Sequence, residues 1–242
     1  MTRPTATAQR RYSATTHTGH VRKVNEDAIL SRPDIGLWAV ADGMGGHAGG
    51  DFASQTVVAA LDRLSAMLQP AEIMHSARSA IQTAHREIGE EAARRGHVTI
   101  GATVVLLVLT EEHFMCLWAG DSRLYRLRGG ALQMISADHS VVGELVEQGY
   151  LTWDEAENHP QANRITRAVG VGEVLEIDKR RGDVQPGDRF LLCSDGLSKY
   201  ADLETLRTYL SDGPPDRVAE ALLEHALAGG GADNVSIIVV DI

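Results

Sequence analysis

The stretch from Leu37 to Gly50 reads L-W-A-V-A-D-G-M-G-G-H-A-G-G, and the rest of the chain is organised around it. Its first five residues, 37–41, are apolar, as in a buried strand, and they lead directly into Asp42. Five of the next eight residues are glycine, which suits neither a helix nor a strand, so we expect a loop. Glycine lets the backbone approach a ligand closely, and a carboxylate beside exposed backbone oxygen suits a hard cation. Taken alone, such a loop is more often a plain turn after a strand.

Other aspartates change that interpretation, because they share one placement at the edge of an apolar, strand-like run: Asp27, Asp121, Asp195 and Asp233. An isolated carboxylate is costly in such a place unless it is paired with a cation or bound to a metal. The shared placement therefore favours a metal site built from strand ends over a set of unrelated turn residues.

The composition excludes several classes of protein. With 242 residues, 43% hydrophobic and 23% charged, the chain predicts one globular domain over 1–242, with 1–9 flexible. A net charge of -10 argues against nucleic-acid and anionic-membrane partners, which need a basic patch. The chain has neither a membrane-spanning apolar run nor a secretory signal, so we expect a cytoplasmic protein. Cys116 and Cys193 lie inside apolar runs without metal-site spacing and are expected to be core thiols.

Two strands, 27–31 and 36–40, are predicted to form a hairpin through the polar connection 32–35. If the turn is centred between Asp34 and Ile35, Asp27 faces Asp42 across the hairpin. Cross-strand partners share one face of a sheet, with Cβ atoms about 5 Å apart. The two carboxylates would then converge at the open end of the hairpin.

The remaining pattern predicts a layered α+β fold. Helices are expected over 52–68, 73–88, 202–210 and 215–227, and strands over 12–16, 101–109, 114–119, 124–127, 132–135, 189–194 and 234–241. Asp195 ends one strand and Asp233 begins another, so antiparallel neighbours would bring them together. Helix pairs between groups of antiparallel strands indicate a β-sandwich with helices outside, in α-β-β-α layers.

A segment without a strong apolar face lies between two groups of core strands and is predicted to form a flap, about 140–163. Within it, Thr152 and Glu155 have the spacing of a capping box, which indicates a short helix.

Seven short motifs follow one another along the chain: R-x-x-N-E-D from Arg22, D-G-M-G-G-H-x-x-G from Asp42, G-A-T, A-G-D-S-R-x-Y, D-H-S, L-L-C-S-D-G-L and A-D-N. In this order they resemble the metal-dependent Ser/Thr protein phosphatases of the PP2C (PPM) family, bacterial branch. The resemblance covers Ser13 to Asp241. It implies an antiparallel β-sandwich flanked by helix pairs, two Mn²⁺ or Mg²⁺ ions in a cleft at one end, and a flap that matches 140–163.

The resemblance also implies the metal ligands. Asp42 would bridge both ions, and Gly43 would offer its backbone carbonyl to one of them. Asp195 and Asp233 would hold the other ion. Asp121 matches the carboxylate of a third, weaker site in bacterial members, although A-G-D-S-R is also explained by a turn cap or a pair with Arg123.

Further roles carry over around these ligands. Glu26 and Asp27 would act mainly through bound waters, and Arg22 matches the family's phosphate-gripping arginine. Asn234 is expected to support the ligands from behind rather than bind metal. Thr103 is expected to be structural.

The implied chemistry agrees with the residue types. Hydrolysis of a phosphate monoester needs charge neutralisation, which two cations and an always-charged arginine fork provide. All-oxygen ligands favour Mg²⁺ or Mn²⁺ over zinc. The chain departs from the eukaryotic branch at Met44, where a histidine is proposed as general acid. His47 lies in the same loop but out of register, so it is either that acid or a structural residue, and a metal-bound water is the alternative proton donor.

We therefore predict a phosphoprotein phosphatase that hydrolyses phosphoserine and phosphothreonine with a metal-bridging water and opposes a bacterial Ser/Thr kinase. One alternative is a narrow-substrate phosphatase, for example of a phosphorylated anti-sigma antagonist. The other is a pseudophosphatase that binds without turnover. Loss of a metal-binding aspartate would indicate the latter, and each expected position keeps its aspartate.

Overall fold

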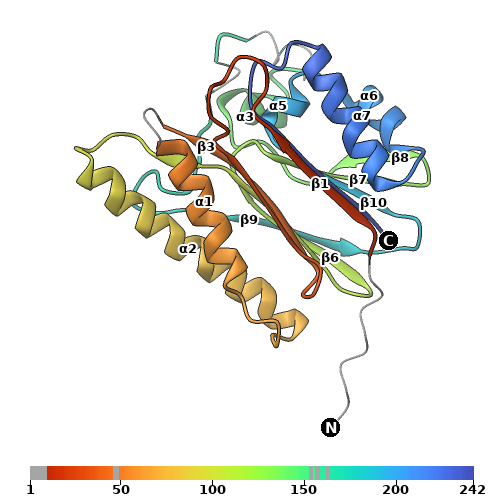
Figure 1. Cartoon of the computed structure of the whole chain (residues 1–242), viewed down its shortest axis with the longest axis horizontal. Coiled ribbons are helices and arrows are strands. Elements are labelled where there is room, and N and C mark those ends of the chain that lie inside the picture. The colour runs from red at the N-terminus through yellow and green to blue at the C-terminus, as the bar shows by residue number, and fades with distance from the viewer. Residues whose placement is uncertain (1–9, 46–48, 153–154, 156–158, 162–163) are drawn as a thin grey trace.

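The computed structural model describes residues 10–45, 49–152, 155, 159–161 and 164–242, and it folds into two stacked β-sheets with helices on both outer faces (Figure 1). The five-stranded sheet has the order β1 (Tyr12–His17), β11 (Val235–Asp241), β10 (Arg189–Cys193), β7 (Arg123–Arg128) and β8 (Ala131–Met134). The six-stranded sheet comprises β2 (Asp27–Arg32), β3 (Leu37–Met44), β5 (Val104–Leu109), β6 (His113–Ala119) and β9 (Asp178–Asp183), with the short β4 (Gly101–Ala102) paired to β3. The strand pairs in both sheets are antiparallel.

The helices cover the two sheets separately. Helices α1 (Gly49–Asp62) and α2 (Pro70–Arg94) pack on the six-stranded sheet. Helices α5 (Asp195–Ser198), α6 (Leu203–Leu210) and α7 (Pro215–Ala228) pack on the five-stranded sheet. The predicted α-β-β-α order of layers is therefore confirmed.

The core has three layers because neighbouring residues of the central strands face opposite sides. In β3, Leu37 and Ala39 face the helices α1 and α2, whereas Trp38 and Val40 lie between the sheets, and each is fully buried. A strand buried on both faces has no polar face to alternate with, which is why its sequence is continuously apolar. Trp38 places a large, rigid surface in the middle layer, where aromatic side chains contribute most to packing.

The predicted hairpin of β2 and β3 has the expected register. Asp27 pairs with Asp42, and Arg32 pairs with Leu37 at the turn. A slip by one residue would exchange the two buried faces of β3 and turn Trp38 from the space between the sheets toward the helices. The hairpin therefore brings the two carboxylates to the same end of the sheet.

The glycine-rich loop is shorter than the sequence predicts. Strand β3 continues through Asp42 and Gly43 to Met44, and helix α1 begins at Gly49. The extra strand residues pair with β4, where Gly43 faces Ala102. Close approach explains the glycine, because a Cβ on Gly43 would lie 2.1 Å from the carbonyl oxygen of Gly50.

The predicted strand 101–109 is divided at Thr103, whose backbone N–H donates to the carbonyl of Asp42 at 2.8 Å instead of continuing the ladder of β5.

Strand β9 is not predicted by the sequence pattern. Its sequence, D-K-R-R-G-D, is polar and largely exposed, and it forms an edge strand only because its backbone pairs with β6. Charged residues are typical of an edge that must not aggregate.

Helix α3 (Val141–Glu147) leaves the core within the predicted flap, and the chain returns where Ile165 pairs with Ser140. Ser140 caps the helix by accepting a hydrogen bond from the N–H of Gly143 at 3.0 Å. The Thr152 and Glu155 contacts of a capping box are also present, at 2.8 and 3.3 Å. The rest of the flap lies partly outside the described residues, as does His47, so the flap boundary and the single-domain organisation stay predictions.

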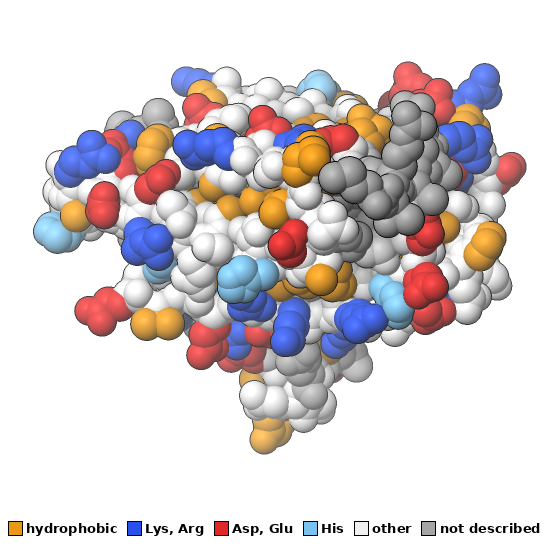
Figure 2. Space-filling model, turned by 90° about the horizontal axis from the view of Figure 1, so that it is seen from below, with side chains coloured by type: hydrophobic (Ala, Val, Ile, Leu, Met, Phe, Trp, Pro, Cys, Tyr) orange, Lys and Arg blue, Asp and Glu red, His pale blue; other side chains and the backbone are white. Residues whose placement is uncertain are grey.

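Surface charges are mixed on the face shown in Figure 2, where acidic and basic side chains alternate with apolar ones. Within the described ranges, no helix is both long enough and apolar enough to cross a bilayer.

Candidate metal centre

Asp27 connects the two sheets at the end where the acidic residues meet. It begins β2 and is 4% exposed, and its Oδ2 accepts hydrogen bonds from Ser194 Oγ at 2.8 Å and Ser236 Oγ at 2.7 Å. Both serines belong to the opposite sheet, at the end of β10 and in β11. The other carboxylate oxygen, Oδ1, is buried and has no hydrogen-bond partner among the described residues.

The surroundings of Asp27 disfavour its charge. Burial is the main cause that raises its pKa to about 6; the charges of Asp195 and Asp233 act in the same direction, and the hydrogen bonds from Ser236 and Ser194 oppose them. A bound cation would reverse this effect, because it favours the ionised carboxylate.

Asp27, Asp42, Asp195 and Asp233 form what we call the acidic group. Asp42 lies at its centre and is partly exposed. Thr103 holds its backbone on both sides: Asp42 N donates to Thr103 Oγ1 at 3.1 Å, and its carbonyl accepts from Thr103 N at 2.8 Å. Removal from water raises the pKa of Asp42 well above its usual value, and the next causes are the charges of Asp27 and Asp195. The charges of Asp121 and Asp233 raise this pKa too, so the aspartates of both sheets act on this one carboxyl group.

Asp195 begins α5 just after β10, and Asp233 lies just before β11, so the antiparallel pairing of these strands brings both aspartates to one end, with a lysine between them. Lys199 Nζ is 2.7 Å from Asp195 Oδ2 and 3.4 Å from Asp233 Oδ2. Asp195 Oδ1 is buried without a hydrogen-bond partner in the described part of the chain. Burial alone would raise the pKa of Asp233, but the hydrogen bond from Arg22 and the charge of Lys199 hold it below its usual value.

Arg22 binds Asp233 with both arms of its fork. Its Nε lies 2.9 Å from Oδ1, and its Nη2 lies 3.0 Å from Oδ2. The Arg22 side chain remains 51% exposed, so the guanidinium lies on the open side of the acidic group. In this arrangement Arg22 is an ion-pair partner of an aspartate, which the sequence did not indicate.

Asn234 holds the segment that carries Arg22 and Glu26. Its Oδ1 accepts from Glu26 N at 2.8 Å, and its Nδ2 donates to the carbonyls of Thr18 at 2.9 Å and Val24 at 3.0 Å. Glu26 in turn accepts a hydrogen bond from Gly43 N at its carbonyl, at 3.1 Å. Asn234 is 5% exposed, and its amide joins this segment to the start of β11.

Asp121 follows β6 at the same end of the molecule. Burial raises its pKa to about 7, together with the charges of Asp195 and Asp138, whereas Arg123 and Lys199 lower it. Arg123 binds Asp138, with Nη2 to Oδ2 at 2.6 Å. The hairpin of β5 and β6 pairs Val104 with Ala119, but Ala102 pairs with Gly43 and Val169 and not with Asp121.

The donor set fits divalent cations. Two buried carboxylate oxygens, on Asp27 and Asp195, have no protein partner in the described part of the chain, and the carboxyls raise one another's pKa values. All these donors are oxygens, which suit Mg²⁺ or Mn²⁺. Among the described residues, no three His, Cys, Asp or Glu side chains already surround one point. Instead, Arg22 forms an ion pair with Asp233, and Lys199 forms one with Asp195.

Sequence reasoning missed three residues of this group: Lys199, Ser194 and Ser236. Lys199 was detectable, because it stands four residues after Asp195, the spacing at which a helical turn brings opposite charges together. The two serines gave no such signal, since they meet Asp27 only through the stacking of the sheets.

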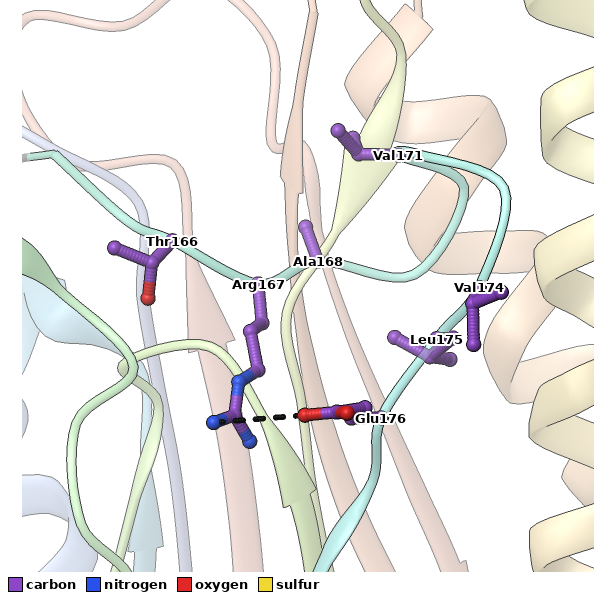
Figure 3. A pocket seen from close by; sticks show the side chains of 7 residues that line it. All are labelled: Thr166, Arg167, Ala168, Val171, Val174, Leu175 and Glu176. Atoms are coloured by element: carbon purple, nitrogen blue, oxygen red, sulfur yellow. Dashed lines mark ion pairs between the residues drawn. The ribbon is translucent and has the colours of Figure 1, made fainter.

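A separate hollow of about 180 Å³ lies in the segment after the predicted flap, lined by Thr166, Arg167, Ala168, Val171, Val174, Leu175 and Glu176 (Figure 3). Arg167 and Glu176 face each other across it, with 3.8 Å between Nη2 and Oε2. Its lining contains none of the predicted metal or phosphate residues. We therefore assign the candidate chemistry to the acidic group and not to this pocket.

Comparison with known proteins agrees with this geometry. Residues 16–225 match the family described as protein phosphatase 2C. Serine/threonine protein phosphatase PstP of Mycobacterium tuberculosis is 36% identical over 233 residues, which cover 96% of this chain, and this chain spans 45% of the length of PstP. Serine/threonine phosphatase stp of Listeria monocytogenes is 32% identical over 235 residues, which cover 93% of each protein.

Solved structures give the same result. PppA, described as a key regulatory component of T6SS in Pseudomonas aeruginosa, superposes with a TM-score of 0.89 and 46% identity, over 97% of this chain and 98% of that one. The catalytic domain of PstP, in complex with two manganese ions, gives a TM-score of 0.87 and 36% identity over 96% of this chain and 97% of that one. This chain belongs to the protein phosphatase 2C family.

Proposed function

We propose that this protein hydrolyses phosphoserine and phosphothreonine in other proteins, with two divalent cations, Mn²⁺ or Mg²⁺, held by the acidic group. The observation that carries the proposal is the convergence of Asp27, Asp42, Asp195 and Asp233 from both sheets, with two buried carboxylate oxygens left without a hydrogen bond in the described part of the chain. The manganese-bound PstP catalytic domain, similar over 96% of this chain, supports the choice of cofactor.

The chain's own residues have distinct tasks in this proposal. When bound, the cations neutralise the phosphate dianion and lower the pKa of the attacking water toward neutrality. Asp42, central among the aspartates, would hold both ions, with the carbonyl of Gly43 as a further ligand. Asp195 and Asp233 would hold one ion from the five-stranded sheet. Asp27 is fixed by its two serines and, like Glu26, would act mainly through bound water.

Arg22 binds the phosphate oxygens from the open side of the group. Its half-exposed guanidinium lies against Asp233, close to where the substrate must enter, and its planar fork matches phosphate geometry. Proton donation to the leaving serine or threonine oxygen falls to water in this proposal, because Met44 carries no proton to give and His47 lies outside the described residues. Asp121 is the proposed ligand of a third, weakly held ion.

The proposed activity defines the class of physiological partners. Phosphoproteins are the substrates, and we propose that they include targets of a Ser/Thr kinase in the same cell. A cytoplasmic location is part of the proposal. A narrow-substrate phosphatase would use the same residues, and a pseudophosphatase would keep the fold without turnover.

The deciding experiment is phosphate release from a phosphothreonine peptide with Mn²⁺, with and without excess chelator. We expect turnover that stops when the metal is removed and returns when Mn²⁺ is restored. Absence of turnover at saturating Mn²⁺, in protein that binds the ion, would favour the pseudophosphatase. Full turnover in excess chelator would contradict the metal mechanism.

A further inference from the structure

Lys199 occupies an unusual position for a lysine, because its ammonium group lies between two of the proposed metal ligands. It contacts Asp195 Oδ2 at 2.7 Å and Asp233 Oδ2 at 3.4 Å. The same Asp233 oxygen also accepts from Arg22. A positive charge thus already lies between the carboxylates that hold one ion in the proposed function, on which this inference rests.

The backbone that carries Lys199 is fixed. Its N–H donates to the carbonyl of Asp195 at 2.9 Å and closes the single turn of α5. Gly196 packs against the segment after Asp233 so closely that a Cβ there would lie 1.9 Å from the carbonyl oxygen of Asn234. The Cα of Lys199 therefore keeps its place relative to both aspartates, and only its four-carbon side chain has freedom to move.

The side chain of Lys199 can also move away from the carboxylates. It is 36% exposed, and a lysine stem can lie along the surface while its ammonium group reaches water. The ammonium is a compact charge without the rigid fork of arginine, so a divalent ion of higher charge density can displace it from the carboxylates.

We propose that Lys199 is a built-in counter-cation that competes with the divalent ion for Asp195 and Asp233. Without metal, the ammonium holds these two carboxylates side by side and offsets their repulsion. With metal, it gives up these contacts and remains nearby as a like charge. Both effects weaken metal binding, so Lys199 sets how much free metal the protein needs and stabilises the metal-free fold.

The test replaces the charge and measures metal binding directly. Lys199→Met keeps the length of the side chain, and Lys199→Gln keeps it polar in case the methionine variant folds poorly. We expect both to bind Mn²⁺ roughly tenfold more tightly than the unaltered protein in calorimetric titrations, within the range of couplings between linked binding events. Lys199→Arg should bind Mn²⁺ no more tightly than the unaltered protein, because it retains the charge and its fork is harder to displace.

Lys23→Met is the matched control, since it removes the same charge from an exposed position next to Arg22. It should change Mn²⁺ affinity much less than Lys199→Met. Thermal unfolding provides the second measurement: metal-free Lys199→Met should melt below the unaltered protein, and saturating Mn²⁺ should remove or reverse the difference.

The outcomes separate this inference from the proposed function. If the unaltered protein binds no Mn²⁺, both fail. If it binds Mn²⁺ and both Lys199→Met and Lys199→Gln bind with equal or weaker affinity, only the counter-cation is refuted. If Lys23→Met tightens binding as much as Lys199→Met, net charge explains the effect and the specific contact of Lys199 is refuted.

Discussion

Asn234→Ala tests whether the segment that carries Arg22 is held from behind by one amide. The substitution removes three hydrogen bonds at once, from Glu26 N and to the carbonyls of Thr18 and Val24. Each buried group left without a partner costs about 1–3 kcal/mol. Water can reach part of the exposed segment, since Val24 is 55% exposed. Three such groups would together cost about 3–9 kcal/mol, and because water replaces some of the lost bonds we expect a loss of about 2–3 kcal/mol in the free energy of unfolding, at the bottom of that sum.

The loss should appear in two measurements. For a chain of this size, about 1 kcal/mol corresponds to a shift of roughly 2–4 °C in Tm, so Tm should fall by about 4–12 °C. Because Arg22 and Glu26 lie on the loosened segment, KM for a phosphothreonine peptide should rise more than kcat falls.

Gln133→Ala serves as the control, because Gln133 is an exposed residue of β8 that accepts one hydrogen bond, from Arg126 at 3.0 Å. It should alter the free energy of unfolding by less than about 0.5 kcal/mol, as surface substitutions usually do. A Tm of Asn234→Ala within about 1 °C of the unaltered protein, with unchanged KM, would refute the role assigned to Asn234, since the lost bonds predict several degrees.

Asp42→Asn should abolish phosphate release and weaken Mn²⁺ binding strongly, because it removes the carboxylate charge proposed to hold both ions. Calorimetry and turnover measured on the same protein test this prediction, and retained turnover would contradict the two-ion site. Arg22→Ala should raise KM clearly while Mn²⁺ affinity changes little, with Arg22→Lys only partly restoring it; an unchanged KM would make Arg22 a structural partner of Asp233. Asp121→Ala should leave the fold and the tight ions intact, yet lower kcat and remove the activation by high Mn²⁺; full kcat would make Asp121 a turn residue. Burial raises the pKa of Asp121 to about 7, so the metal-free folded protein binds the proton of this carboxyl group more tightly than the unfolded chain does. The protonated carboxyl therefore adds stability at low pH, and this stability is lost as pH rises from about 4 to about 7. Melting of unaltered protein and Asp121→Asn in chelator should therefore show the unaltered protein losing Tm relative to the variant over that range, and a constant difference would contradict the raised pKa.

Local sequence determined the layers and the pairing of Asp27 with Asp42. The apolar run of β3 can be buried only between two layers, and the short turn after Arg32 fixes its register with β2. The order of the motifs along the chain likewise indicated the family. These features depend on neighbours along the chain or across one tight turn, so their physical cause can be found in the sequence itself.

Tertiary structure alone decided how the acidic group is held together. Ser194 and Ser236 reach Asp27 from positions 167 and 209 residues away, and only the stacking of the two sheets brings them there. Strand β9 exists because β6 offers its backbone an edge, since its own charged sequence has no apolar alternation. Arg22 and Lys199 lie on Asp233 because desolvated carboxylates attract whatever cation the fold places within reach, and that choice depends on three-dimensional proximity rather than on local pattern.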